Sequence, residues 1–127
     1  MIKDIDHLSV VTTDLERARK FYVDLLGFHE TMRLETTHSG TIIFVALKGT
    51  QLELFGGGEP KAAEAGSRQV GYTHIALLVE DIDAVYERLA AAGVEFSMKP
   101  TTVDSGLRIA FFPDPDGNSL ELMQRPS

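Results

Sequence analysis

The sequence predicts an α+β fold built from two copies of one βαβββ module. Three observations predict it: a short apolar strand running into a helix cap occurs twice, each following helix stops at a glycine, and both copies end on Leu-Glu-Leu. A duplicated module constrains architecture more tightly than local propensity does. We therefore expect one domain over residues 1–127, with module one at 1–55, a linker at 56–70 and module two at 71–127.

Each module opens on a strand that carries a histidine. Residues 7–15 read HLSVVTTDL and residues 74–82 read HIALLVEDI, so the two segments share their apolar pattern, the histidine and an aspartate. Runs of β-branched and aliphatic residues of this length are typical of buried strands.

A helix is expected after each of these strands. Asp14 and Asp81 are suited to cap the first helical turn, because a carboxylate accepts from free backbone N–H groups there. Apolar residues then recur at helical spacing and stop at Gly27 and Gly93, which are typical helix ends. Leu25 in the first helix and Val85 in the second are predicted to lie in the buried stripes, as core residues.

Strand-like segments complete each module. The candidates are residues 41–47 and 51–55 in module one, and 108–112 and 119–123 in module two. Residues 113–118 read PDPDGN, which predicts a turn joining the last two strands. The matching turn in module one is expected at 35–40, and the Gly- and Ala-rich stretch at 56–70 has no apolar period, as expected for a linker.

Four potential metal ligands share the predicted concave face. Alternate strand residues point to opposite sides of a sheet, so the leucines of Leu-Glu-Leu suit the helix side. His7 and His74 are then left on the opposite side, together with Glu53 and Glu121. Two imidazoles and two carboxylates are therefore expected to converge.

A convergence of two carboxylates predicts a bound cation, since a buried charge must be paired, protonated or coordinated. A single strand histidine or glutamate is more often only half-buried, but chance does not explain the equivalent positions of both pairs. Imidazole and carboxylate ligands suit Zn, Ni, Mn, Fe or Co. Four protein ligands leave coordination positions open for water or substrate, as in catalytic sites.

Composition excludes several other functions. The net charge is −7, with 19 acidic and 12 basic side chains, so the electrostatic signature of nucleic-acid binding is missing. There is no cysteine, which excludes thiolate metal sites and cysteine nucleophiles. The N-terminus is charged, and the longest apolar run, 42–47, is too short to cross a membrane. We expect a cytoplasmic protein without membrane or nucleic-acid partners.

The chain resembles the vicinal oxygen chelate superfamily, also called the glyoxalase/bleomycin resistance protein/dioxygenase family, over essentially its whole length. The resemblance rests on five segments: His7-Leu-Ser-Val-Val, Phe21-Tyr22-Val-Asp-Leu-Leu-Gly27-Phe28, Leu52-Glu53-Leu54, Tyr72-Thr-His74-Ile-Ala-Leu and Asp114-Pro-Asp-Gly117-Asn-Ser-Leu-Glu121-Leu. It implies an incomplete β-barrel around a metal that chelates vicinal oxygens of a small-molecule substrate. Small members are typically homodimers.

Within this family the His/Glu/His/Glu order is most similar to glyoxalase I (lactoylglutathione lyase). That similarity implies metal-assisted proton transfer with Glu121 or Glu53 as the catalytic base. Glutathione-using lyases often carry Arg where this chain has Val11. The predicted substrate-binding residues are mostly apolar: Val11, Phe44, Phe55, Tyr72, Arg108 and Met123.

Three alternatives remain open at this point. Extradiol dioxygenases of the family hold Fe(II) with two histidines and one glutamate, so Glu53 is surplus. Epimerases of the methylmalonyl-CoA type usually carry Gln in place of Glu53. Bleomycin-type resistance proteins bind a drug without metal, which leaves the ligand quartet unexplained. The resemblance also leaves open whether the metal site forms within one chain or across a dimer.

Overall fold

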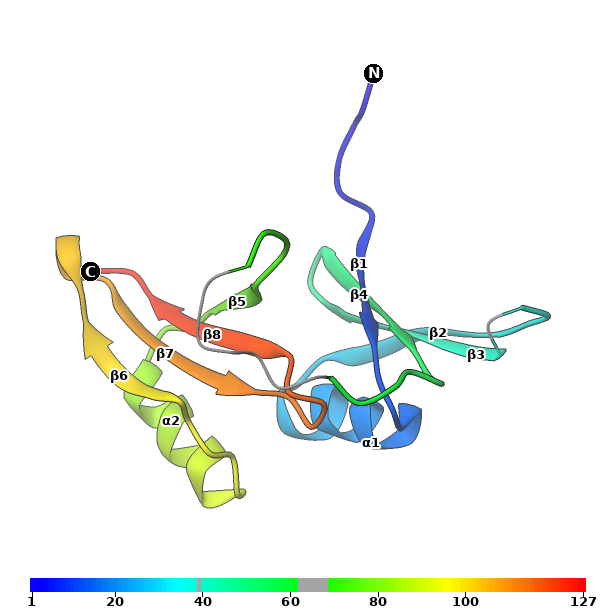
Figure 1. Ribbon diagram of the computed structural model, residues 1–127. Helices are drawn as coiled ribbons and strands as arrows, with labels where there is room; N and C mark the ends of the chain where they lie inside the picture. Colours follow the sequence, from blue (N-terminus) through cyan, green and yellow to red (C-terminus); the bar gives the residue numbers. More distant parts are fainter. Residues whose placement is uncertain (39, 62–68) are drawn as a thin grey trace. The chain divides into compact units, whose positions relative to one another are not determined.

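The computed structural model describes residues 1–38, 40–61 and 69–127. These residues form two four-stranded sheets, each accompanied by a helix from its own half of the chain (Figure 1). The chain divides into two compact units, Met1–Ala62 and Ala63–Ser127. The predicted α+β fold with two βαβββ modules is confirmed.

Unit one follows the predicted order of one strand, one helical segment and three strands. Its sheet has the order β1-β4-β3-β2, with β1 parallel to β4 and the other pairs antiparallel. The elements are β1 (His7–Val11), α1 (Leu15–Arg19), the π-helical η1 (Lys20–Leu25), β2 (His29–Thr36), β3 (Gly40–Leu47) and β4 (Thr50–Phe55).

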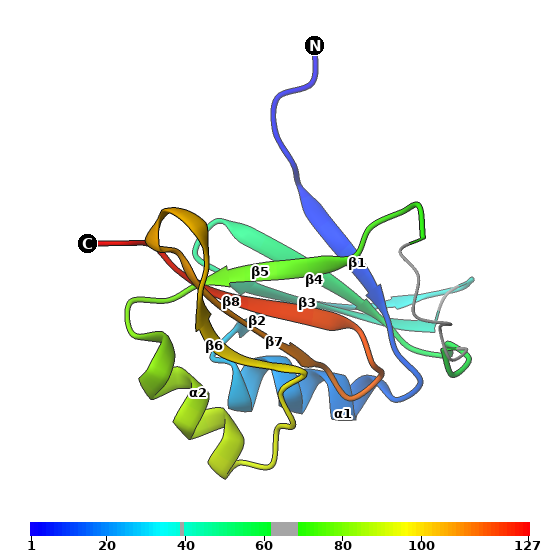
Figure 2. The same cartoon turned by 60° about the vertical axis from the view of Figure 1, so that its left-hand side comes forward.

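Unit two repeats this topology. Its sheet has the order β5-β8-β7-β6, with β5 parallel to β8, and Figure 2 shows β8, in red, between β5 and β7. The elements are β5 (His74–Leu78), α2 (Ile82–Ala91), β6 (Met98–Thr102), the short 3₁₀ turn η2 (Asp104–Gly106), β7 (Arg108–Pro113) and β8 (Ser119–Gln124). In both units the first strand therefore lies beside the last.

The helix boundaries follow the predicted signals. The side chains of Asp14 and Asp81 each accept a hydrogen bond from the backbone N–H three residues later, as N-caps do. Gly27 and Gly93 follow the helices with φ of +89° and +97°. Glycine adopts this left-handed conformation without the steric cost that a Cβ imposes.

The first helix departs from the prediction in its second half. Residues 20–25 form a π-helix, in which the backbone N–H of Leu26 donates to the carbonyl of Phe21 at 3.0 Å. A π-turn holds more residues than an α-turn, so it rotates the buried face. Tyr22 is fully buried, whereas Leu25 is half-buried, and the prediction of Leu25 as a core residue is wrong.

The second helix buries its ends more deeply than its middle. Ile82 and Leu89 have no exposed surface, whereas Val85, which was expected in the core, is half-buried. Ile82 and Leu89 lie seven positions apart on one stripe of α2, and α2 contacts β6, β7 and β8. The prediction of Val85 as a core residue is therefore wrong, whereas the predicted stripe is fully buried at Ile82 and Leu89.

The strands β2 and β6 were not located from the sequence. β2 reads HETMRLET and β6 reads MKPTT, and both are exposed strands at a sheet edge. Polar side chains and a proline are common on edge strands, because they discourage pairing with other chains. The apolar alternation that marks a strand is therefore weak in both.

Two predicted connections are only partly described. The turn expected at 35–40 is shorter, since β2 continues to Thr36 and β3 begins at Gly40, and residue 39 lies outside the described residues. In the linker expected at 56–70, residues 62–68 also lie outside them.

Each unit has a core between its helix and its sheet. The four leucines of the two Leu-Glu-Leu segments are at most 1% exposed and lie on the predicted helix side. They are joined in the core by Ala18, Tyr22, Ile43 and Val45 in unit one and by Ile82, Leu89, Ala110 and Phe112 in unit two. Across the described part of the chain, no helix is long and apolar enough to span a membrane.

Candidate functional site

The parallel pairing of β1 with β4 brings His7 beside Glu53. The register places Ser9 opposite Glu53 and His7 opposite Gln51, so these side chains share one face of the sheet. Nε2 of His7 lies 3.4 Å from Oε1 of Glu53, and the two side chains are 31% and 13% exposed. Two of the four predicted ligands therefore lie together in unit one.

His7 is oriented by the residue that precedes it. Nδ1 of His7 donates to Oδ2 of Asp6 at 2.7 Å, and a carboxylate can only accept. This hydrogen bond raises the pKa of His7 above its ordinary value of 6.5, and the charge of Glu53 adds to the increase against a partial desolvation. With its proton on Nδ1, a neutral His7 presents the Nε2 lone pair to Glu53.

Unit two holds an equivalent pair. Nε2 of His74 lies 3.1 Å from Oε1 of Glu121, and the side chains are 34% and 8% exposed. Nδ1 of His74 is within hydrogen-bond distance, 2.8 Å, of the hydroxyl of Thr73. The residue before the histidine therefore orients the imidazole in both units.

An aromatic ring contacts each histidine from the strand beyond the one that carries the glutamate. Phe44 meets His7 edge-on, with ring centroids 5.3 Å apart, and Phe111 meets His74 in the same way at 5.2 Å. Both phenylalanines are paired in register with the glutamate of their unit. Edge-to-face packing of this kind restricts the rotation of the imidazole.

The donor chemistry of these pairs fits a divalent cation. A neutral Nε2 and a carboxylate oxygen both present lone pairs, so their close approach is favourable only with a proton or a cation between them. No group of three or more His, Asp or Glu side chains in metal-binding proximity is found among the described residues. In that part of the chain the candidate ligands occur as pairs.

Several predicted substrate-binding residues flank the pairs on the same sheet faces. Val11 lies opposite Phe55 in the β1–β4 register, and Met123 lies opposite Leu78 in the β5–β8 register. Val11 is 57% exposed and Phe44 only 7%, while Phe55 and Met123 are half-buried. Tyr72 precedes β5 and is fully exposed. Apolar side chains therefore adjoin both His–Glu pairs.

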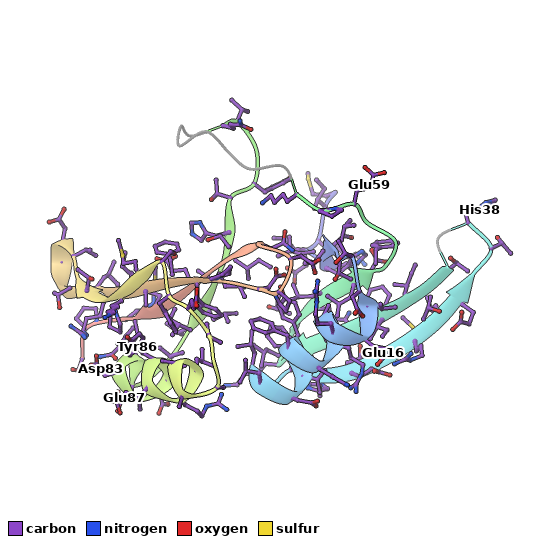
Figure 3. All side chains as sticks on the ribbon, turned by 60° about the horizontal axis from the view of Figure 1, so that its bottom comes forward. Glu16, His38, Glu59, Asp83, Tyr86 and Glu87 are labelled. Carbon is purple, nitrogen blue, oxygen red and sulfur yellow. The ribbon has the colours of Figure 1, made fainter. Side chains whose placement is uncertain are left out.

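Arg108 lies on the other face of its sheet. Arg108 alternates along β7 with Ile109 and Phe111, so its side chain lies on the opposite face from theirs. Nη2 of Arg108 donates to Oδ1 of Asp83 on α2 at 2.7 Å, and Nη1 donates to the hydroxyl of Thr102 at 2.9 Å. Figure 3 shows Asp83 on this helix. The placement ties Arg108 to α2 and does not favour direct substrate contact.

Sequence reasoning missed the residues that support the pairs. Asp6, Thr73, Ser9 and Phe111 were not identified as parts of a site. A polar residue directly before each histidine is visible in the sequence as a signal. The contact of Ser9 with Glu53 depends instead on strand register, which no local pattern shows.

Comparisons with named proteins give relatives of several kinds. The probable lactoylglutathione lyase of Vibrio cholerae is 32% identical, covering 93% of this chain and 88% of that protein. The ethylmalonyl-CoA/methylmalonyl-CoA epimerase of Cereibacter sphaeroides is 33% identical over 98% of this chain and 99% of the enzyme. YwkD of Bacillus subtilis, 29% identical over 98% and 99%, carries no activity in its name.

Solved structures share the fold over nearly the whole chain. SMU.1112c matches with a TM-score of 0.86 and 27% identity, covering 97% of this chain and 99% of that one. TnmS3, an antibiotic binding protein from Streptomyces sp. CB03234, matches with a TM-score of 0.77 and 31% identity over 98% of both chains. The model of the Glyoxalase/Bleomycin resistance protein/Dioxygenase superfamily matches residues 4–122. The chain belongs to this superfamily.

Proposed function

We propose that the chain is a divalent-metal-dependent enzyme of the glyoxalase I type. It acts as a lyase or isomerase on a small substrate with vicinal oxygens, by proton transfer. The observation that carries the proposal is the repeated pair, His7 with Glu53 and His74 with Glu121, at 3.4 and 3.1 Å between Nε2 and Oε1. These four side chains are the proposed ligands of one Zn, Ni, Mn, Fe or Co ion.

The proposed reaction combines a bound cation with proton transfer by a glutamate. A bound divalent cation would polarise the substrate carbonyl and stabilise negative charge that develops on the adjacent oxygens. Glu121 or Glu53 would take the proton from the carbon next to that carbonyl and return it to the neighbouring carbon. Nothing is oxidised overall, so the reaction is an isomerisation. The histidines keep their orientation through Asp6 and Thr73.

The surroundings of the pairs favour an apolar substrate. Val11 is exposed beside His7 and Glu53 at the position where glutathione-using lyases often carry Arg. An aliphatic side chain gives no charge to a substrate carboxylate, whereas it suits an aliphatic or aromatic group. We therefore infer a small aliphatic or aromatic ligand in place of glutathione.

A metal-free binding protein is the second candidate. The likeness to the antibiotic binding protein TnmS3, at 31% identity, and the apolar side chains near both pairs favour it. The supported His–Glu pairs would then have no function, which is why we rank it second. An Fe(II) extradiol dioxygenase needs two histidines and one glutamate as ligands, so Glu53 would have no role as a metal ligand.

Metal analysis of protein purified without chelator tests the proposal. We expect close to one divalent metal per set of four ligands, and isomerisation that needs no oxygen. Metal-free protein that binds an aromatic drug would support the resistance function instead. Oxygen consumption during turnover would support the dioxygenase.

We also infer a homodimer, since β1, β2, β5 and β6 are edge strands and unpaired edges favour association. Sedimentation measures the mass of the protein in solution and tests for the dimer. A co-refolded mixture of His7→Ala and His74→Ala chains then tests where the ligands meet. Recovered metal binding indicates a site shared between chains, and no recovery in a verified heterodimer indicates a site within one chain.

A further inference from the structure

We propose that Ser9 is a positioning residue that holds the carboxylate of Glu53 for metal binding, so that Glu53, unlike Glu121, is oriented by a hydroxyl. The inference rests on the proposed metal-dependent function. It concerns a side chain that neither the ligand set nor the predicted substrate contacts include.

The contact itself is short and made to a charged group. Oγ of Ser9 donates to Oε1 of Glu53 at 2.6 Å, within the range of strong hydrogen bonds to carboxylates. The parallel register of β1 and β4 places the two residues directly opposite one another on the same face. Both backbones are held by the sheet, so the hydroxyl restricts the rotation of the glutamate side chain.

The hydrogen bond also determines which oxygen is occupied. Ser9 and Nε2 of His7 both approach Oε1, at 2.6 and 3.4 Å. Within the described residues no donor reaches Oε2 of Glu53. Both contacts of the Glu53 carboxylate with β1 are therefore made through Oε1.

The duplicated module provides an internal comparison. Ala76 occupies in unit two the register position that Ser9 occupies in unit one, directly opposite Glu121. β5 pairs with β8 in the same way without a hydroxyl, so the sheet does not require Ser9. Because only unit one has a hydroxyl at this position, the side-chain contacts of Glu53 and Glu121 differ. Glu53 has a hydroxyl donor on the facing strand, whereas the side-chain contact of Glu121 on its facing strand is with His74.

Cobalt titration of the full-length apoprotein tests the proposal, because Co²⁺ absorption reports both affinity and ligand geometry. The variants are Ser9→Ala, which removes the hydroxyl, and Ser9→Thr, which keeps it at an exposed position. The matched control is Thr41→Val, which removes a similar hydroxyl-to-carboxylate hydrogen bond, 2.7 Å long, from Thr41 to Glu35 in the same unit. Circular dichroism and thermal midpoints verify that each variant folds.

We expect Ser9→Ala to weaken Co²⁺ binding roughly tenfold and to alter its absorption bands, as loss of a residue that orients a ligand does. Ser9→Thr and Thr41→Val should retain the wild-type affinity and spectrum. Unchanged affinity and spectrum in Ser9→Ala, or equal loss in Ser9→Thr, overturns the inference and leaves the metal proposal standing. If the wild type binds no Co²⁺, or His7→Ala binds as tightly as the wild type, the proposed function fails and the inference fails with it.

Discussion

Nε2 of His74 and Oε1 of Glu121 lie 3.1 Å apart, although the two residues are separated by 47 positions in the chain. The Glu121 side chain is only 8% exposed, so its charge is largely withdrawn from water and depends on a nearby partner. Removal of the imidazole would leave this carboxylate without its neighbour. The same dependence applies, less strongly, to the more exposed Glu53.

Replacement of either site histidine should abolish tight metal binding. We expect His7→Ala and His74→Ala to lose the metal, because each removes a nitrogen ligand and strands a carboxylate. His38→Ala is the matched control, since His38 lies exposed at the tip of the β2–β3 hairpin (Figure 3). Metal content per chain after dialysis measures the effect. A stoichiometry unchanged from the wild type would refute the ligand assignment.

Leu89→Ala should destabilise the protein by roughly 2–5 kcal/mol, the usual cost of truncating a buried leucine and leaving a cavity. Leu89 has no exposed surface. Leu25→Ala is the matched control, because Leu25 is also a leucine in a helix but is half-buried, and its cost should be smaller. Urea unfolding measures the stability of both variants. An equal loss of stability would contradict the difference in burial between Leu89 and Leu25.

Glu16→Gln should destabilise the protein near neutral pH but not in acid. Hydrogen bonds from Arg19 and then Arg33 lower the pKa of Glu16 below its ordinary value of 4.5. A group with a lowered folded-state pKa stabilises the fold above its unfolded-state pKa and loses that effect as the pH falls through the folded-state value. The difference from wild type should therefore shrink as the pH falls below 4.5 and disappear below the lowered folded-state pKa of Glu16.

Thermal midpoints across that range measure the effect, which is small because Glu16 is exposed on α1 (Figure 3). Glu87→Gln is the control: Glu87 is exposed on α2, and among the described residues it has no ion pair. Its midpoint should match the wild type at every pH. A constant difference for Glu16→Gln down to the most acidic point would show that the ion pairs do not cause it.

Turnover of the methylglyoxal–glutathione adduct should be weak. Val11 offers no positive charge beside His7 and Glu53, so the carboxylates of glutathione gain no ion pair there. Val11→Arg should lower KM for this adduct more than it changes kcat, because the added charge binds substrate and transition state alike. Efficient isomerisation by the wild type would restore a plain glyoxalase I function.

Much of the fold and part of the candidate site were predictable from local patterns. Asp14 and Asp81 cap helices because a carboxylate satisfies nearby N–H groups, which depends on a few adjacent residues. Alternation along Leu-Glu-Leu placed the leucines in the core and the glutamates on the other face. The polar edge strands β2 and β6 lack that alternation, so their residues could not be assigned.

By itself the sequence determined the duplicated βαβββ plan, the helix caps and the face on which each histidine and glutamate lies, since these follow from short-range periodicity and backbone geometry. Only the tertiary structure decided the rest: the π-turn that buries Tyr22, the ion pair that draws Arg108 to Asp83, and the register that sets Ser9 against Glu53. The physical reason is that strand register and side-chain partners are chosen by hydrogen bonds and packing between segments far apart in the chain.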